Sequence, residues 1–246
     1  MVEPDSLAPP KPRGVLVHLR GHVLLFDGKP APQYEASAGL RLLFIAIVLE
    51  AVRLGLVRWF YPKVPLLVLV PLFLGCALLA VRFGAGLRLS QIGFKPWHRW
   101  SATEKSYFVQ LLIIGNVVFP LVFAAPLRRI FAQSSVLETV TNVFVPYLLY
   151  GVYQEVVYRG MLQSELVRRW RAFIGILASN ILYTFGPLHS YYFSSRVSFA
   201  LPMFASIFAI GLFFGILFRK SGNLWIVAII HGIGNSYIVG SLGSVP

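Results

Sequence analysis

The chain has 246 residues, of which 57% are hydrophobic and only 13% are charged, and its mean hydropathy is +0.72. This composition excludes an ordinary soluble domain and indicates a membrane protein with several spans. The formal net charge of +13 would suggest a nucleic-acid partner in a soluble protein, but here the basic residues lie between apolar runs, so we expect membrane topology and contact with membrane lipid, and no nucleic acid, to account for them.

The first forty residues differ from the rest of the chain, because they are mixed in character and contain several prolines. We therefore expect an extramembrane segment over residues 1–40 and a membrane domain over residues 41–246. Within the first segment, Val15 to Phe26 could form a short strand pair or an amphipathic element.

Seven apolar stretches follow, and most have the roughly 20 apolar residues that a helix needs to cross a bilayer. Strand signals are nearly absent, so we predict an all-α, polytopic membrane helix bundle of about seven spans. The basic and aromatic segment 83–106 is typical of an interfacial helix. The predicted spans are roughly 42–60, 64–82, 107–126, 137–158 (continuing as a helix to about 168), 172–188, 198–218 and 223–240.

Cys76 is the only cysteine, so an intrachain disulfide and a thiolate metal cluster are both excluded. It lies in an apolar run with no basic partner nearby. This setting predicts a core or lipid-facing position rather than a catalytic thiol.

Basic residues set the expected orientation. If the N-terminus is cytoplasmic, most of the loop Lys and Arg residues fall on the cytoplasmic side, including Arg168, Arg169, Arg171, Arg219 and Lys220. This bias predicts an N-in, C-out topology.

Three polar clusters fall at similar depth in the predicted bundle. With a rise of about 1.5 Å per residue, Glu155 lies roughly 24 Å and His189 roughly 27 Å from the basic turn at Arg171. Counted from Lys220 in the same way, Asn235 lies roughly 22 Å into the membrane. The sequence therefore predicts one shared site in the outer half of the membrane.

Glu155 and Arg159 form the most informative pair, because ionisable groups inside a membrane span are expensive to bury and are usually functional. Their i, i+4 spacing places both on one face of a helix. The alternative is an ion pair that only locks helices together. For the similar pair Glu50 and Arg53 in the first span, we prefer that structural interpretation.

His189 follows Phe185 by one helical turn, and His231 and Asn235 are also one turn apart. Each of them alone is explained by packing or by an interhelical hydrogen bond. Together, a carboxylate and a histidine can hold and deprotonate a water molecule, while a second histidine and an amide can stabilise an oxyanion. This set of groups favours peptide-bond hydrolysis without a covalent intermediate. Zinc bound by two histidines and a glutamate is the rival chemistry, although the chain has no HExxH spacing.

These residues match the motifs of a known family, and the chain resembles the CPBP (Abi) intramembrane proteases, which include the CAAX-processing endopeptidases of the Rce1 type. That family shows EExxxR, FxxxH and HxxxN on successive membrane helices, and the resemblance covers about residues 140–240. The matching residues are Gln154, Glu155 and Arg159, then Phe185 and His189, then His231 and Asn235.

The resemblance implies a role for each residue and no cofactor. The first glutamate of the family pair activates water together with His189, whereas Glu155, paired with Arg159, shapes the site. His231 and Asn235 stabilise the oxyanion. The resemblance thus implies a glutamate-type membrane endopeptidase.

Gln154 departs from the family pattern, since it stands where the family has its first glutamate. An amide cannot act as a general base at neutral pH, so we expect little or no hydrolysis by this chain. Either a deliberate Glu→Gln change silences an active protease, or the protein is a natural pseudoprotease. We favour the first explanation, because every other motif position is intact.

A site near the outer leaflet favours an exported, membrane-anchored or lipidated protein as the partner, cleaved near its C-terminus. Among the relatives that the resemblance suggests, the bacterial sorting-type members (myxosortases) fit this geometry, so we expect a bacterial inner or plasma membrane. A membrane protein that binds peptides or confers immunity without cleaving anything is the alternative. A transporter is disfavoured, since the polar residues form one cluster and no inverted repeat is visible.

Overall fold

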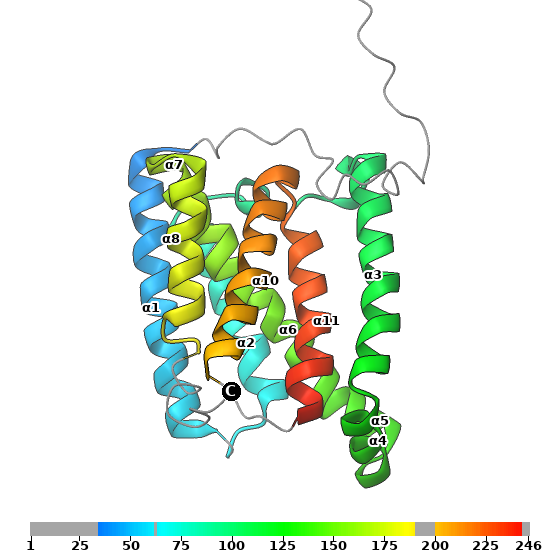
Figure 1. The fold of residues 1–246 in the computed structure, drawn as a ribbon. Helices are drawn as coiled ribbons and strands as arrows, with labels where there is room; N and C mark the ends of the chain where they lie inside the picture. The colour runs from blue at the N-terminus through cyan, green and yellow to red at the C-terminus, as the bar shows by residue number, and fades with distance from the viewer. Residues whose placement is uncertain (1–33, 62, 190–199, 243–246) are drawn as a thin grey trace, which may run out of the picture.

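The computed structural model describes residues 34–61, 63–189 and 200–242. The expected element at Val15 to Phe26, like nearly all of the predicted 1–40 segment, lies outside the described residues. Within the described ranges all regular structure is helical, which confirms the all-α membrane bundle. In Figure 1 the main helices stand side by side, roughly along one common direction.

The first part of the bundle contains α1 (Ala36–Phe60), α2 (Leu66–Leu79) with a π-helical end over Ala80–Gly84, and α3 (Ala102–Val122). The helix predicted for the interface between α2 and α3 is wrong. The segment instead forms two short 3₁₀ turns, Leu89–Ile92 and Trp97–Arg99. Glycines with positive φ angles at 86 and 93 and a proline at 96 interrupt any longer helix there.

This linker docks on the turn that precedes the last helix. The backbone N–H of Leu224 donates to the carbonyl of Gly93 over 2.9 Å. Lys95 bonds Glu104 at 2.8 Å and the carbonyl of Ser221 at 3.0 Å. The linker therefore ties the start of α3 to the end of the bundle at which the last helix begins.

The third span begins and ends earlier than predicted. Helix α3 ends at Val122, and a separate helix α4 (Ala124–Gln133), which the sequence analysis did not anticipate, follows after Phe123. Helix α4 carries Arg128 and Arg129 among apolar residues and is amphipathic. In Figure 1 it lies at the lower end of α3, beyond the end of α11.

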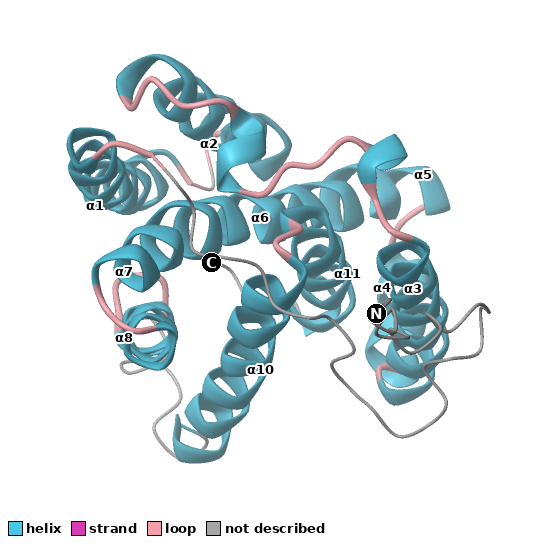
Figure 2. Ribbon diagram, turned by 90° about the horizontal axis from the view of Figure 1, so that it is seen from above, coloured by secondary structure: helices cyan, strands magenta, loops and turns pink. Residues whose placement is uncertain are grey.

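One long helix runs through the middle of the molecule, and it continues to Arg169 as predicted. It consists of α5 (Val136–Thr139), a π-helical stretch (Val140–Phe144), α6 (Val145–Glu155), a second π-helical stretch η6 (Val156–Gln163) and α7 (Ser164–Arg169). Figure 2 shows α6 in the centre, with α1 and α2 on one side and α10 and α11 on the other. The last three helices among the described residues are α8 (Ala172–Phe185), α10 (Ala200–Ser221) and α11 (Leu224–Leu242).

A buried network joins α1 to the long helix. Arg53 donates to Glu50 through Nε and Nη2 over 2.9–3.2 Å and to the hydroxyl of Tyr150 over 3.2 Å. The hydroxyls of Tyr153 and Tyr158 donate to the two oxygens of Glu50 over 3.1 and 3.0 Å. The pair thus makes hydrogen bonds across the helix–helix contact, as a structural ion pair should.

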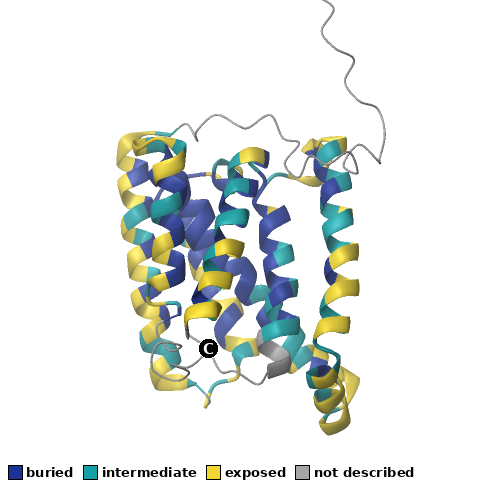
Figure 3. Cartoon of the chain, viewed as in Figure 1, coloured by how far each residue is buried: buried dark blue, intermediate teal, exposed yellow. Residues whose placement is uncertain are grey.

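Many residues on the exposed outer faces of the helices, which Figure 3 marks, are large and hydrophobic, the pattern of helices that face lipid. In the part of the chain that the structure describes, three helices are long and apolar enough to cross a membrane: Leu66–Gly84, Ala102–Val122 and Leu201–Ser221. The stretches Ala172–Phe185 and Leu224–Ile238 are apolar but shorter. The protein is therefore an integral membrane protein, whereas the count of seven spans and the N-in orientation stay predictions. Cys76 is exposed on the apolar helix α2, as expected for a lipid-facing residue.

Candidate active site

The six residues singled out in the sequence lie on three parts of the bundle that face one another. Gln154 and Glu155 end α6, and Arg159 follows in η6. His231 and Asn235 lie on α11, and His189 lies in the turn after α8. All but Asn235, which is half-buried, are buried.

Glycines bring α6 and α11 close together at this point. A Cβ atom on Gly151 would lie 2.5 Å from the backbone of Gly232, and one on Gly232 would collide with the carbonyl of Leu148. Because neither helix presents a side chain here, the backbones approach closely. His231, the residue before Gly232, is therefore held directly against α6.

Glu155 is fully buried and interacts with two partners. Its Oε1 accepts a hydrogen bond from Nδ1 of His231 over 2.7 Å. Its Oε2 lies 3.4 Å from Nε of Arg159, which is an ion pair but not a hydrogen bond. The carboxylate therefore binds more tightly to the histidine of the third motif than to the arginine of its own motif.

Arg159 is held by a carbonyl and an aromatic ring. Its Nη2 donates to the carbonyl of Gly211 on α10 over 2.8 Å, and its guanidinium carbon lies 4.3 Å from the ring centre of Tyr183. Among the described residues, Nε and Nη1 of Arg159 and Oε2 of Glu155 have no hydrogen-bond partner. This incomplete pairing is unusual for a buried charge and is typical of functional sites.

Gln154 and Asn235 form an amide pair. Nδ2 of Asn235 donates to Oε1 of Gln154 over 2.8 Å. A glutamate at position 154 could accept the same hydrogen bond, since it has the same shape and an oxygen at the same place. The pair therefore fits either residue.

His189 joins the cluster through Tyr183. Its Nδ1 lies 2.8 Å from the carbonyl oxygen of Tyr183, an acceptor only, so Nδ1 carries the proton and Nε2 is the basic nitrogen of the neutral ring. The hydroxyl of Tyr183 lies 3.2 Å from Nε2 of His231. The structure thus links motif residues from all three parts of the bundle into one cluster.

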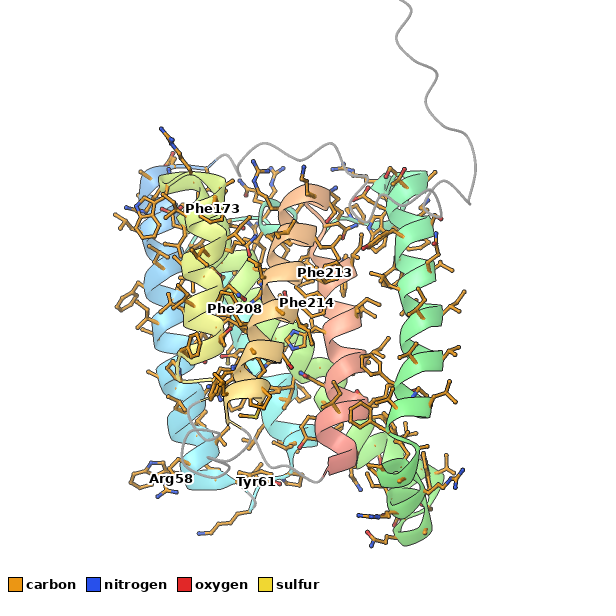
Figure 4. All side chains as sticks on the ribbon, in the orientation of Figure 1. Arg58, Tyr61, Phe173, Phe208, Phe213 and Phe214 are labelled. Atoms are coloured by element: carbon orange, nitrogen blue, oxygen red, sulfur yellow. The ribbon has the colours of Figure 1, made fainter. Side chains whose placement is uncertain are left out.

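Phe185, by contrast, lies at the edge of this cluster. It is half-exposed, and its ring stacks on Phe204 of α10 with ring centres 5.5 Å apart. Two other rings pack on His231, those of Phe214 and Tyr183, with ring centres 5.4 and 5.9 Å away, and Figure 4 shows Phe214 at mid-height in the bundle. Figure 4 also places Arg58 and Tyr61 at the opposite end of the bundle from Phe173.

Three contributors to this arrangement were missed in the sequence analysis: Tyr183, Gly151 and Gly232. The glycine directly after a motif histidine was a signal for close helix packing. Tyr183 gave no such signal, because one tyrosine in an apolar helix is ordinarily a packing residue.

The described residues contain no group of three or more His, Cys, Asp or Glu arranged to hold a metal ion. Both ring nitrogens of His231 already have partners, Glu155 and Tyr183. The choice between a metal and a metal-free site stays a prediction, and the chemistry proposed below is written without a metal.

Residues 136–237 match the family model described as "Type II CAAX prenyl endopeptidase Rce1-like". The matched segment begins at the first residue of α5, ends two residues after Asn235 and contains all six site residues. Comparison of the chain with curated proteins and with solved structures gave no match.

Proposed function

The chain belongs, through residues 136–237, to the Rce1-like family, and on this premise we propose that it is an intramembrane endopeptidase silenced by Gln154. Its substrates are the C-terminal segments of membrane-anchored or lipidated proteins. The observation that carries the proposal is the linkage of Glu155, His231 and Tyr183 with the Gln154–Asn235 pair beside it. A structural ion pair alone has no need for this second histidine and amide.

With glutamate at position 154, each group has a chemical role. The carboxylate at 154, oriented by Nδ2 of Asn235, takes a proton from the attacking water, and Nε2 of His189 helps to hold that water. Glu155 keeps His231 in place and is balanced by Arg159. The second amide N–H of Asn235 stabilises the oxyanion that forms on the scissile carbonyl, while His231, bonded to Glu155 and Tyr183, supports this side of the site as a neutral ring. No covalent intermediate and no metal take part.

Gln154 blocks the first step of this reaction, because a neutral amide does not accept a proton from water. Loss of a general base lowers a rate by about 10²–10⁴-fold. The geometry around position 154 is compatible with the glutamate, so a single substitution should restore the active enzyme.

The first test compares the chain as it stands with Gln154→Glu on two probes, each with and without a chelator. One probe is a farnesylated peptide ending in Cys-Val-Ile-Met, and the other is a single-span peptide with a polar C-terminal tail. We expect cleavage only by Gln154→Glu, and cleavage that survives the chelator. Clear turnover by the chain as it stands, or activity that the chelator abolishes, would contradict the proposal.

The proposed topology places this site toward the outer leaflet of a bacterial plasma membrane, with the N-terminus inside. The exported, C-terminally anchored substrates of sorting-type family members suit that location. Labelling of single cysteines introduced near each terminus, in intact cells, tests it. An externally labelled N-terminus would contradict this part of the proposal.

The alternative is a membrane protein that holds a peptide without cleaving it. The observation that favours it is the well-formed hydrogen bond between Gln154 and Asn235, since glutamine is fully accommodated there. In that case Gln154→Glu still binds the tailed peptide but cleaves neither probe.

A further inference from the structure

Within the described part of the chain, the side chain of Tyr183 contacts residues of all three motifs, and no motif includes it. It lies on α8, is buried, and touches Arg159, His189 and His231. We propose that Tyr183 is the positioning residue of this site, fixing the tautomer of His231 and aligning Arg159 and His189 with it. The proposal rests on the proposed function and adds a residue to its machinery.

The hydroxyl acts on His231. Nδ1 of His231 faces the carboxylate of Glu155 over 2.7 Å, and a carboxylate accepts hydrogen bonds, so Nδ1 carries the proton. Nε2 of the neutral ring is then an acceptor, and the Tyr183 hydroxyl, 3.2 Å away, donates to it. Glu155 and Tyr183 together therefore define one tautomer and one ring orientation for His231.

The backbone of the same residue acts on His189. The carbonyl of Tyr183 accepts from Nδ1 of His189, which makes Nε2 the basic nitrogen of that ring. The two rings also meet edge to face, with centres 5.0 Å apart and an interplanar angle of 86°. A shift of Tyr183 would thus move both histidines at once.

The ring acts on Arg159. The guanidinium carbon lies 4.3 Å from the ring centre, the geometry of a cation–π contact, which is strengthened where water is excluded. The ring and the carbonyl of Gly211 thus give the guanidinium two partners besides Glu155, whose Oε2 lies 3.4 Å from Nε of Arg159.

A tyrosine that served only to fill the core would not need these three separate contacts. Tyr153, whose hydroxyl serves the α1 network instead of this site, supplies a matched control. It is also fully buried, and its hydroxyl also bonds a buried group, Oε1 of Glu50 over 3.1 Å. Its contacts belong to the α1 network, so Tyr153→Phe removes an equivalent hydroxyl without touching the site.

The first experiment uses the full chain with Gln154 in place and needs no activity. ¹⁵N NMR of histidine-labelled protein in lipid is recorded for the chain, Tyr183→Phe and Tyr153→Phe, with His231 assigned by the loss of its signals in His231→Gln. We expect the Nε2 resonance of His231 to shift in Tyr183→Phe and to stay unchanged in Tyr153→Phe. An unchanged Nε2 resonance in Tyr183→Phe overturns the proposal.

The second experiment measures cleavage in the Gln154→Glu background, on whichever of the two probes is cleaved. Tyr183→Phe should lower kcat about tenfold and leave KM unchanged, because it removes one hydrogen bond and misaligns the reacting groups. Tyr183→Leu, which also removes the ring from Arg159, should lower kcat further. Tyr153→Phe should leave both constants unchanged.

The outcomes separate the two proposals. Equal kcat in Tyr183→Phe and its parent, or a raised KM with unchanged kcat, overturns the positioning role while the protease assignment stands. If Gln154→Glu cleaves neither probe, the protease assignment fails, and the NMR result alone decides whether Tyr183 positions His231. The conclusion does not depend on Tyr183→Leu folding, because Tyr183→Phe keeps the ring.

Discussion

The protein contains two buried Glu–Arg pairs that differ in their hydrogen bonds. Glu50 and Arg53 lie on α1 and contact the long helix, whereas Glu155 and Arg159 lie on the long helix itself. Glu50 and Arg53 make three mutual hydrogen bonds, and three tyrosine hydroxyls bond the same two side chains. Glu155 and Arg159 make none with each other, and Glu155 instead bonds His231.

The difference shows which pair serves the fold and which serves a site. A buried ion pair whose partners are fully hydrogen-bonded fixes a packing arrangement. In the second pair, Oε2 of Glu155 and Nε and Nη1 of Arg159 have no hydrogen-bond partner among the described residues. Such incomplete pairing lowers stability and is expected at a functional site. The two clusters touch at one place, where the rings of Tyr158 and Tyr183 meet edge to face with centres 5.3 Å apart.

The largest expected effect is on stability, in Glu50→Gln. This isosteric change leaves the charge of Arg53 buried without a counter-charge, and breaking such a pair destabilises a protein by about 3–5 kcal/mol. Thermal unfolding in detergent measures it, and probe cleavage per folded molecule in the Gln154→Glu background should not change. An unaltered unfolding midpoint would mean that the pair does not hold α1 in place.

The matched change Glu155→Gln should lower activity strongly and stability only slightly. In the Gln154→Glu background we expect about a hundredfold lower kcat, because a neutral amide oxygen is a weaker acceptor than the carboxylate for Nδ1–H of His231 and holds the ring less firmly. The stability loss should be smaller than for Glu50→Gln, since Arg159 keeps its bonds to Gly211 and the Tyr183 ring. If Glu155→Gln instead destabilised more and left kcat unchanged, the assignment of the two pairs would be reversed.

A third prediction concerns the glycine contact that presses α11 on α6. Gly151→Ala places a methyl group against the Gly232 backbone, and overpacking of this kind destabilises by about 1–3 kcal/mol. The paired control is Gly75→Ala in α2, where nothing lies within 4 Å of the new atom, so the helix should become slightly more stable. Comparing the two unfolding midpoints checks the prediction, and equal shifts would refute close helix contact.

The smallest effect is expected for Tyr158→Phe. It removes one of the three hydroxyls that bond the Glu50–Arg53 pair, and a single hydrogen bond contributes about 1 kcal/mol. The ring that contacts Tyr183 remains, so cleavage in the Gln154→Glu background should be unaffected. A fall in kcat larger than the fall in stability would show that the two clusters are coupled.

Much of the fold followed from the sequence because apolar length and helix-breaking residues act locally. The helices that end at Phe60, Arg169 and Ser221 lie close to their predicted ends. The prediction was wrong in the linker between α2 and α3, where basic and aromatic residues resembled an interfacial helix. Short turns form there instead, because two glycines have positive φ angles and the linker bonds the turn that precedes α11.

That the six residues lie close together was predictable, but their connections were not. The i, i+4 spacings place Glu155 with Arg159 and His231 with Asn235 on shared helix faces, since a helix fixes which side chains point the same way. Spacing could not show that Glu155 binds His231 more closely than Arg159, or that Tyr183 lies between the two histidines.

The sequence by itself therefore determined the class of protein, the approximate helix bounds and the residues that gather at one depth, because hydrophobicity and helical period are properties of single segments. Only the tertiary structure decided which partner each buried charge has. That choice depends on how closely helices distant in the chain approach one another, and at this site the glycines at 151 and 232 and the ring of Tyr183 set the approach.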